Sequence, residues 1–362
     1  MTLTYLDLSP AQRASLDTLP FEGNHLVSGP PGSGKSLLAA QRALMLALTG
    51  TPTVLLTRSN LLRQTLAPVV SALGAEDHGV RVATAHAWLT HWFGGDAPRT
   101  DDGWFDWASF YERAAVTDHG PAPTLVVDEG QDLPIGFYRL CRILGSRTTV
   151  YADECQRLTA TNSTISEISS SLGGCTHHEL AGNHRNTRQI AELAAHFHTG
   201  ATAPPLPDRP GPNSRLHRLG RPDAVTDLLI ALATHHPRYS IGVILGSTRA
   251  QSDLLTRLER KAPRLRPQLY TSQATQGRYR TVDLTRPGIV IVNRASAKGL
   301  GFDTVVVPDT HTDNATDPSS TALRMTYYVL ATRARQELHF GYEGNVEPPV
   351  LAPVSPNLLL RG

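Results

Sequence analysis

The chain has 362 residues, 40% of them hydrophobic and 18% charged, with a net charge of +2 at pH 7. This composition indicates a globular protein of about two domains, excludes a disordered or polybasic chain, and leaves only a local patch for any contact with nucleic acid. The three cysteines lack metal-ligand spacing and argue against a disulfide framework, no signal pattern opens the chain, and no apolar run approaches the ~18 residues of a membrane span, so we expect a cytoplasmic protein without membrane contact.

Strands and helices are predicted to alternate in the first half of the chain. Ser9-Pro10 starts an amphipathic helix that extends to Asp17. Apolar, β-branched runs predict strands at 25–28, 53–57, 80–84, 124–127 and 147–152, and amphipathic stretches predict helices at 37–48, 60–73, through 92 and at 104–116. The polar, Ser-rich stretch 161–174 is compatible with either a loop or a short helix.

A second alternating pattern follows. Strands are predicted at 177–180, 241–246, 289–292, 304–307 and 337–342, and helices at 187–198, 222–235, 248–261 and 319–332. Residues 201–213 predict a Pro/Gly-rich surface loop, and residues 263–288 are irregular and Arg-rich. The chain is therefore expected to be α/β, with two domains of parallel sheet covered by helices, at residues 1–174 and 175–362.

The stretch 29–36, GPPGSGKS, fits the phosphate-binding loop pattern and lies between a predicted strand and a predicted helix. Gly29, Gly32 and Gly34 let the backbone curl so that its N–H groups point at a polyphosphate, and the helix N-terminus adds partial positive charge. Lys35 can reach the terminal phosphates, and the Ser36 hydroxyl can hold Mg²⁺. The alternative, a chance Gly-rich turn, explains neither the Lys-Ser pair nor the flanking elements.

Two acidic residues follow the predicted strand 124–127 directly. In a chain with a phosphate loop, an acid at this place orients Mg²⁺, and a second acid beside it can accept a proton from the attacking water. We assign Asp128 to the metal and Glu129 to the base. An isolated Asp-Glu pair would more simply be a solvated loop, but the phosphate loop favours the functional interpretation.

The order of motifs along the chain resembles that of superfamily 1 helicases of the UvrD, Rep and PcrA type. The acidic block 128–132, DEGQD, matches the family's DExQD. Further blocks match in order at Gln12, 57–60 (TRSN), 84–86 (TAH), 152–156 (ADECQ), 180–187 (LAGNHRNT), 296–300 (SAKGL) and 328–334 (YVLATRA). The resemblance covers nearly the whole chain.

This resemblance implies two RecA-like domains with ATP in the cleft between them. It implies that Gln12 reads adenine, that His184 replaces an aromatic residue stacked on it, and that Gln156 couples the γ-phosphate to the second domain. Arg185 and Arg333 would act as arginine fingers on the charge that develops during phosphoryl transfer. For any single arginine in so Arg-rich a chain, a surface ion pair is the alternative.

The sequence also departs from the family. Residues 89–123 and 263–288 are too short for the accessory domains inserted there. Aromatic residues that stack on bases are replaced, at Arg58, at Ala85 and after position 156, although Arg58, His86 and Arg294 remain candidates for contact with nucleic acid. Gly301 replaces a Glu that reaches the nucleotide sugar.

We therefore expect a Mg²⁺-dependent ATPase with a minimal helicase core that engages single-stranded DNA or RNA. The alternative is an ATP-driven switch that regulates a protein partner, such as a nuclease or toxin of a defence or repair system, without unwinding. A metabolic kinase lacks support, because no acceptor site is visible in the sequence.

Overall fold

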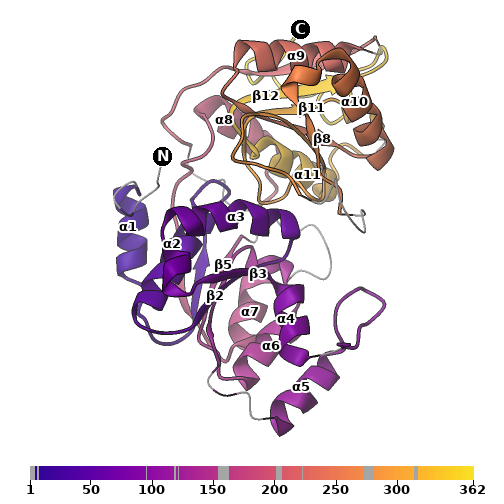
Figure 1. Cartoon of the computed structure of the whole chain (residues 1–362). Helices are drawn as coiled ribbons and strands as arrows, with labels where there is room; N and C mark the ends of the chain where they lie inside the picture. The colour runs from indigo at the N-terminus through magenta and orange to yellow at the C-terminus, as the bar shows by residue number, and fades with distance from the viewer. Residues whose placement is uncertain are drawn as a thin grey trace. The chain divides into compact units, whose positions relative to one another are not determined.

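The protein consists of two compact units, Met1–Ala181 and Gly182–Gly362, which the chain enters in turn (Figure 1). The structure is a computed structural model. It describes Tyr5 and residues 8–94, 96–117, 120, 122–153, 163–200, 206–221, 223–272, 281–313 and 317–362. Each unit contains one parallel sheet with helices between its strands, so the predicted α/β fold of two tandem RecA-like units is confirmed.

The first unit is built on a six-stranded parallel sheet in the order β3-β2-β4-β5-β1-β6. Its strands are β1 (His25–Ser28), β2 (Thr53–Thr57), β3 (Arg81–Thr84), β4 (Thr124–Val127), β5 (Thr148–Ala152) and β6 (Thr176–Glu179). The four central strands are buried throughout, as expected for parallel strands covered on both faces. The two edge strands, β3 and β6, are more exposed.

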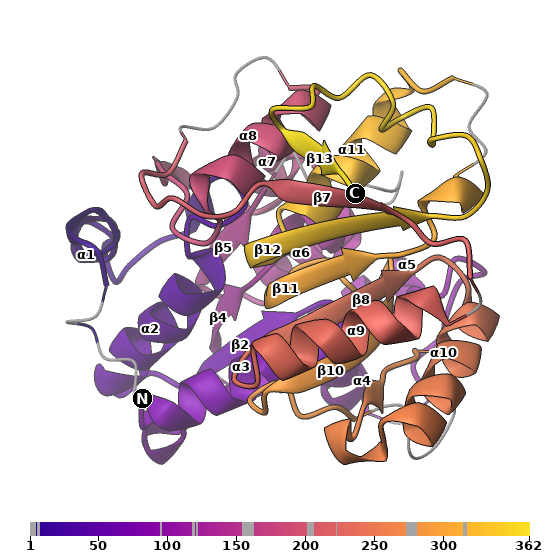
Figure 2. The same cartoon turned by 90° about the horizontal axis from the view of Figure 1, so that it is seen from above.

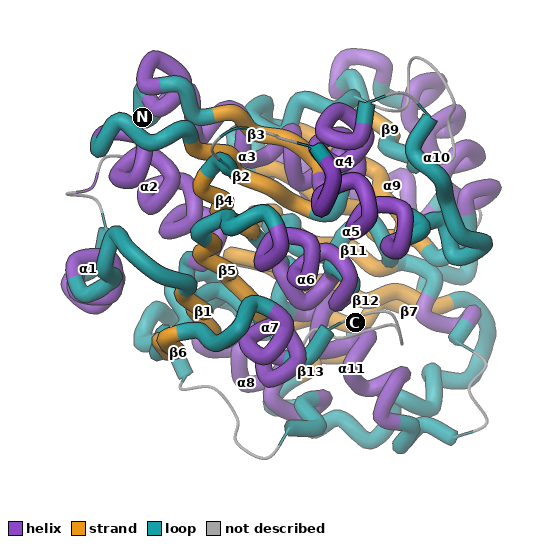
Figure 3. The backbone as a smooth tube through the Cα atoms, turned by 90° about the horizontal axis from the view of Figure 1, so that it is seen from below, coloured by secondary structure: helices purple, strands orange, loops and turns teal. Residues whose placement is uncertain are grey.

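Helices cover both faces of this sheet and give it two separate apolar cores. The helices are α1 (Pro10–Asp17), α2 (Lys35–Leu48), α3 (Asn60–Ala72), α4 (Ala85–Phe93), α5 (Trp107–Val116), α6 (Ile135–Ile143) and α7 (Ile165–Ser171). One core lies under α1, α2 and α3, and the other lies under α4 to α7, the helices seen in front of the first sheet in Figure 3. Leu26 and Val27 pack into opposite cores, because successive strand residues face opposite sides of a sheet.

The second unit contains a seven-stranded parallel sheet in the order β13-β7-β12-β11-β8-β10-β9. Its strands are β7 (Ser214–Arg218), β8 (Ser240–Leu245), β9 (Gln268–Leu269), β10 (Gly288–Asn293), β11 (Phe302–Val307), β12 (Ala334–Tyr342) and β13 (Leu359–Arg361). Its helices are α8 (Arg188–Phe197), α9 (Ala224–His235), α10 (Thr248–Lys261) and α11 (Thr321–Ala331). Figure 2 shows β12, β11, β8 and β10 side by side in this sheet.

The division between the units falls later than the predicted domain boundary at 174/175. Strand β6 pairs in parallel with β1, with Leu26 opposite His177, so residues 175–181 complete the first sheet. The pattern of a short strand before a helix could not show which sheet that strand joins. The pairing of β6 with β1 is a contact between segments about 150 residues apart, which no local pattern encodes.

Helix α6 and strands β7, β9 and β13 were not predicted, and helix α5 starts three residues later than predicted. Helix α6 contains Gly136, which disfavours a helix, while β7 and β13 are short and carry polar residues. Helix α5 begins at Trp107 rather than Trp104, because the Asp106 side chain accepts a hydrogen bond from the Ala108 N–H and caps it.

The four tryptophans pack in or against the core on the side of the first sheet covered by α4 to α7. Trp88 and Trp104 are buried, and Trp92 and Trp107 are partly buried against the same cluster. Trp104 lies ahead of α5, so its burial does not come from helical spacing. None of the helices in the described ranges is long and apolar enough to cross a lipid bilayer.

Candidate functional site

The loop between β1 and α2 has the backbone that its glycines permit. Gly32 and Gly34 have φ values of 84° and 93°, which side-chain-bearing residues rarely adopt. Gly34 is also the N-cap of α2, and a Cβ there would collide with the Gln12 amide. A Cβ on Gly29 would lie 2.8 Å from the Cβ of Leu180. The loop thus leads directly into the N-terminus of a 14-residue helix, where the first backbone N–H groups carry partial positive charge.

Gln12 is tied to this loop. Its Nε2 donates to the Ser33 carbonyl at 3.1 Å, and its Oε1 accepts from the Ser9 N–H at 3.0 Å in a capping box at the start of α1. Gln12 is thereby fixed against the loop. Contact of Gln12 with adenine stays a prediction. In this structure both the oxygen and the nitrogen of its side-chain amide form hydrogen bonds with backbone groups of the first unit.

Lys35 is buried against its own loop. Its Nζ donates to the carbonyls of Gly29 at 2.6 Å and Pro30 at 2.9 Å, and it lies 3.4 Å from Oδ2 of Asp153. Asp153 follows β5, the strand next to β1, and is itself buried. The ammonium group therefore sits where the carboxyl ends of β1 and β5 meet, the edge at which parallel sheets bind ligands.

Asp128 follows β4, the other neighbour of β5, and carries a buried, unsatisfied carboxylate. The residue is 1% exposed, and in the part of the chain that the structure describes neither carboxylate oxygen meets the geometry of a hydrogen bond. Burial, together with the charge of Glu129, raises the pKa of Asp128 to about 7, while the Ser36 hydroxyl and Lys35 oppose this rise. A buried carboxylate beside a hydroxyl is a ready donor set for a hard cation.

Glu129 is held in an unusual backbone conformation. Its φ is 53°, and Arg266 is the one other non-glycine residue in the described ranges with a positive φ. Nε2 of Gln131 donates to Oε2 of Glu129 at 2.5 Å. The next residue must be glycine, because a Cβ on Gly130 would lie 2.8 Å from the Tyr138 hydroxyl oxygen and closer still to Val150.

Gln131 joins the two halves of this acidic site. While Nε2 bonds Glu129, Oε1 accepts from the Asp153 N–H at 3.0 Å, and Asp153 in turn faces Lys35. Gln131 is fully buried. Gln131 and Asp153 belong to the motif blocks DEGQD and ADECQ, but the sequence analysis assigned no role to either residue. Their place in those two motifs was the signal that could have identified them. Gln156 lies outside the described residues.

In the second unit, Arg185 and Arg333 converge on a single carbonyl. The Leu300 carbonyl accepts from Arg185 Nη1 at 3.3 Å and from Arg333 Nη1 at 3.2 Å. Asn186 Nδ2 donates to the Thr332 carbonyl at 3.2 Å. The blocks around residues 183–187, 296–300 and 328–334 thus form one cluster in the second unit. His184 is exposed beside this cluster.

Arg333 is also a structural residue. It is 0% exposed, and its guanidinium donates to the Val329 carbonyl and to the Thr332 hydroxyl oxygen, each at 2.9 Å, as well as to Leu300. These bonds add a contribution to folding that the sequence did not suggest.

Arg333→Ala is therefore expected to lower the free energy of unfolding by about 2–4 kcal/mol, because it leaves buried carbonyls unpaired. Urea unfolding of the variant measures this loss. Below its unfolding transition, a finger role predicts a fall in kcat much larger than any loss of ATP affinity. A loss of affinity alone contradicts that role. Arg335→Ala, which removes a half-exposed guanidinium 3.7 Å from Asp303, is the matched control.

Two of the predicted nucleic-acid contacts are adjacent in the first unit, but a tryptophan lies on both. The guanidinium of Arg58 lies 4.1 Å from the ring centroid of Trp104, and the His86 ring stacks on Trp104 at 4.3 Å. His86 Nε2 also lies 3.3 Å from the Gly103 carbonyl oxygen, and burial lowers the pKa of His86. In this structure the Arg58 guanidinium and the His86 ring both pack against Trp104.

Arg294, the third predicted contact, lies in the second unit at a cavity of about 610 Å³ at the carboxyl ends of β8, β10 and β11. Its guanidinium donates to Asp309 Oδ1 at 3.0 Å and also to Asp313, and these carboxylates raise the pKa of Arg294. The positive charge is thus matched by two negative ones. A phosphate at this place would have to displace a carboxylate.

This chain is similar in fold to several solved structures. No family model matches the chain, and no curated protein matches it. The C-terminal domain of a possible DNA helicase from Lactobacillus plantarum WCFS1 is similar at 22% identity and a TM-score of 0.37, over 49% of this chain and 97% of that one. Arterivirus nonstructural protein 10, a helicase, is similar at 14% identity and a TM-score of 0.45, over 91% of this chain and 61% of its own.

The same arterivirus helicase in complex with DNA is similar at 14% identity and a TM-score of 0.41. That match covers 94% of this chain. This chain spans 61–64% of the length of the two arterivirus chains. The parallel sheets and their interleaved helices place the protein in the class of α/β proteins with tandem RecA-like units.

Proposed function

We propose that this protein is a Mg²⁺-dependent ATPase built on a superfamily 1 helicase core of the UvrD type. The observation that carries the proposal is the buried, unpaired carboxylate of Asp128, next to Ser36 and Lys35 of a phosphate loop in the first unit. The carboxyl ends of β4, β5 and β1 bring these groups together, although they lie about 90 residues apart in the chain. An ordinary glycine-rich turn would not require a costly buried acid beside it.

The residues present fit a bound Mg²⁺. Ser36 and Asp128 would hold the ion through oxygen atoms, which Mg²⁺ prefers, and when bound it supplies positive charge that neutralises the phosphates. The loop N–H groups and the start of α2 bind the polyphosphate. Lys35 exchanges its bonds to the Gly29 and Pro30 carbonyls for the terminal phosphates of ATP.

Asp128 and Glu129 have different roles in this proposal. Asp128 belongs to the cation, and the Glu129 carboxylate accepts a proton from the attacking water. Gln131 holds Glu129 in place and couples it to Asp153. In this proposal Arg185 and Arg333 stabilise charge on the transferred phosphoryl group, Gln156 responds to the γ-phosphate, and Gln12 and His184 hold the adenine.

Single-stranded DNA or RNA is the proposed effector of this ATPase. The basic groups Arg58 and Arg294 and the imidazole of His86 are its candidate contacts. The alternative, an ATP-driven switch that acts on a protein partner, is favoured by one observation: Trp104 covers Arg58 and His86, while Asp309 and Asp313 neutralise Arg294. Basic side chains that are already covered or paired bind the phosphates of a nucleic-acid strand weakly, and weak binding disfavours movement along that strand.

An ATPase assay with and without single-stranded DNA or RNA separates the two functions. The motor predicts turnover stimulated about tenfold or more, together with strand binding that weakens steeply with salt. Turnover that ignores nucleic acid supports the switch and contradicts the motor. Absence of any Mg²⁺-dependent hydrolysis, with or without a strand, contradicts the ATPase itself.

A further inference from the structure

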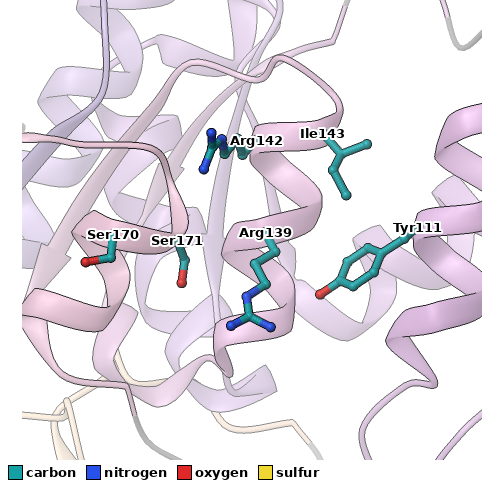
Figure 4. Close-up of a pocket in the computed structure, with 6 residues that line it drawn as sticks. All are labelled: Tyr111, Arg139, Arg142, Ile143, Ser170 and Ser171. Carbon is teal, nitrogen blue, oxygen red and sulfur yellow. The ribbon is translucent and has the colours of Figure 1, made fainter.

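The first unit has a cavity on the face of its sheet opposite to α2. It has a volume of about 500 Å³ and is lined by residues of three helices, α5, α6 and α7 (Figure 4). The lining residues are Tyr111, Arg139, Arg142, Ile143, Ser170 and Ser171. These helices pack into the core that contains Phe110 and Phe137, whereas α2 packs into the other core. The cavity is thus separate from the phosphate loop.

The two guanidinium groups of this cavity belong to exposed side chains and have no protein partner among the described residues. Arg139 and Arg142 lie three residues apart on α6, a spacing that puts them on one side of the helix. Over the ranges that the structure describes, neither donates a hydrogen bond nor pairs with a carboxylate, and no acidic residue lines the cavity. By contrast, Arg147 of the same unit pairs with Glu22 at 2.7 Å.

The remaining lining residues suit an anion with an organic body. Figure 4 shows the Arg139 side chain extending between Ser171 and Tyr111, with Ser170 on the same side as Ser171. The Tyr111 hydroxyl donates to the Gly136 carbonyl at 3.1 Å, which orients its ring at the cavity wall. Ile143, 49% exposed, adds an apolar edge. The lining thus combines two serine hydroxyls and two guanidinium groups with one aromatic and one aliphatic side chain.

We propose that this cavity binds a phosphate-bearing ligand outside the phosphate loop. Arginine forks pair with phosphate oxygens through two parallel hydrogen bonds, and serine hydroxyls donate to the same oxygens. A volume of about 500 Å³ exceeds that of a phosphate group alone and falls in the range of ligand pockets for small organic molecules. The phosphate belongs either to the backbone of a single-stranded nucleic acid or to a free small molecule.

The test uses the full chain with Lys35→Ala, so that binding at the phosphate loop is weakened in every sample. Inorganic phosphate is titrated by calorimetry, and a fluorescein-labelled oligothymidylate of about ten nucleotides by anisotropy. Adding Arg139→Ala and Arg142→Ala should weaken binding of the recognised probe by at least about tenfold, since each charge-assisted contact contributes strongly. For the oligonucleotide, the salt dependence of binding should also become shallower by about one or two contacts.

Arg81→Ala is the matched control, because it removes an exposed arginine elsewhere in the first unit. It should change affinity by no more than about twofold. A loss for inorganic phosphate identifies a free phosphate ligand, and a loss for the oligonucleotide alone identifies a phosphodiester. Equal affinities of the double variant and the control, or no binding of either probe up to about 10 mM, overturn the proposal.

Ligand binding at this cavity is proposed to be independent of ATP hydrolysis at the phosphate loop. With Lys35 intact, the Arg139→Ala and Arg142→Ala changes should leave basal hydrolysis unaltered, because neither residue belongs to the nucleotide site. Circular dichroism checks folding of each variant. If the double alanine variant unfolds, replacement of both arginines by lysine decides the matter: it keeps the charge, loses the forks and should still weaken binding measurably, while unchanged affinity for both probes counts against the site.

Discussion

Glutamine in place of Glu129 is expected to lower ATP turnover by about 10²–10⁴-fold while ATP binding persists. The carboxylate is 5% exposed and is held by Gln131 at 2.5 Å, so it is placed and oriented before any ligand arrives. An amide of the same size preserves the packing but cannot accept the proton of water. The effect should therefore appear in kcat and leave nucleotide affinity nearly unchanged.

Lys35→Ala is the companion variant and should lose both binding and turnover. The Lys35 ammonium is the one lysine group at the loop, and its removal also frees the Gly29 and Pro30 carbonyls. Nucleotide binding by fluorescence and hydrolysis by phosphate release distinguish the two variants. Normal hydrolysis by the Glu129→Gln variant would show that another group is the base.

Asp128→Asn should make the protein more stable in the absence of divalent cation. The carboxylate is buried, and burial together with the charge of Glu129 raises its pKa from 3.8 to about 7. A neutral amide of the same size avoids the cost of that buried charge. At pH 8 the gain in the free energy of unfolding should be on the order of 2–4 kcal/mol.

The pH dependence follows from the sign of this shift. Because the folded state binds the Asp128 proton more tightly than the unfolded state does, wild-type stability from this group decreases as pH rises from about 4 to about 7. The variant lacks that decrease, so the two proteins converge below about pH 4. Urea unfolding across this range measures it, with the exposed Asp101→Asn as control.

Ligands should reverse the order of stability. Mg²⁺ with ATP stabilises only a protein that binds them, so wild type should gain stability and Asp128→Asn should gain little. A variant no more stable than wild type at pH 8 without cation would mean that the Asp128 carboxylate is satisfied in solution. The cation assignment would then lose its main support.

Local pattern predicted most strands and helices correctly. Strands β1, β2 and β4 and helix α10 have the predicted bounds, because apolar β-branched runs and capped amphipathic stretches encode element type within a few residues. Helix α6 was missed, since Gly136 weakens its helical pattern and its apolar face is recognisable only against the core it covers. The same local signals identified the phosphate loop and the acidic pair, which follow β1 and β4, two parallel strands separated in the sheet by β5.

The sequence by itself determined the two α/β units, the phosphate loop and the identity of the acids that follow β4, because each depends on residues close together in the chain. Tertiary structure decided what those side chains contact. It buried Arg333 within its own unit, laid Trp104 on Arg58, paired Arg294 with two carboxylates and joined Glu129 to Asp153 through Gln131. The physical reason is that burial and charge pairing depend on partners distant in sequence, which a local pattern does not specify.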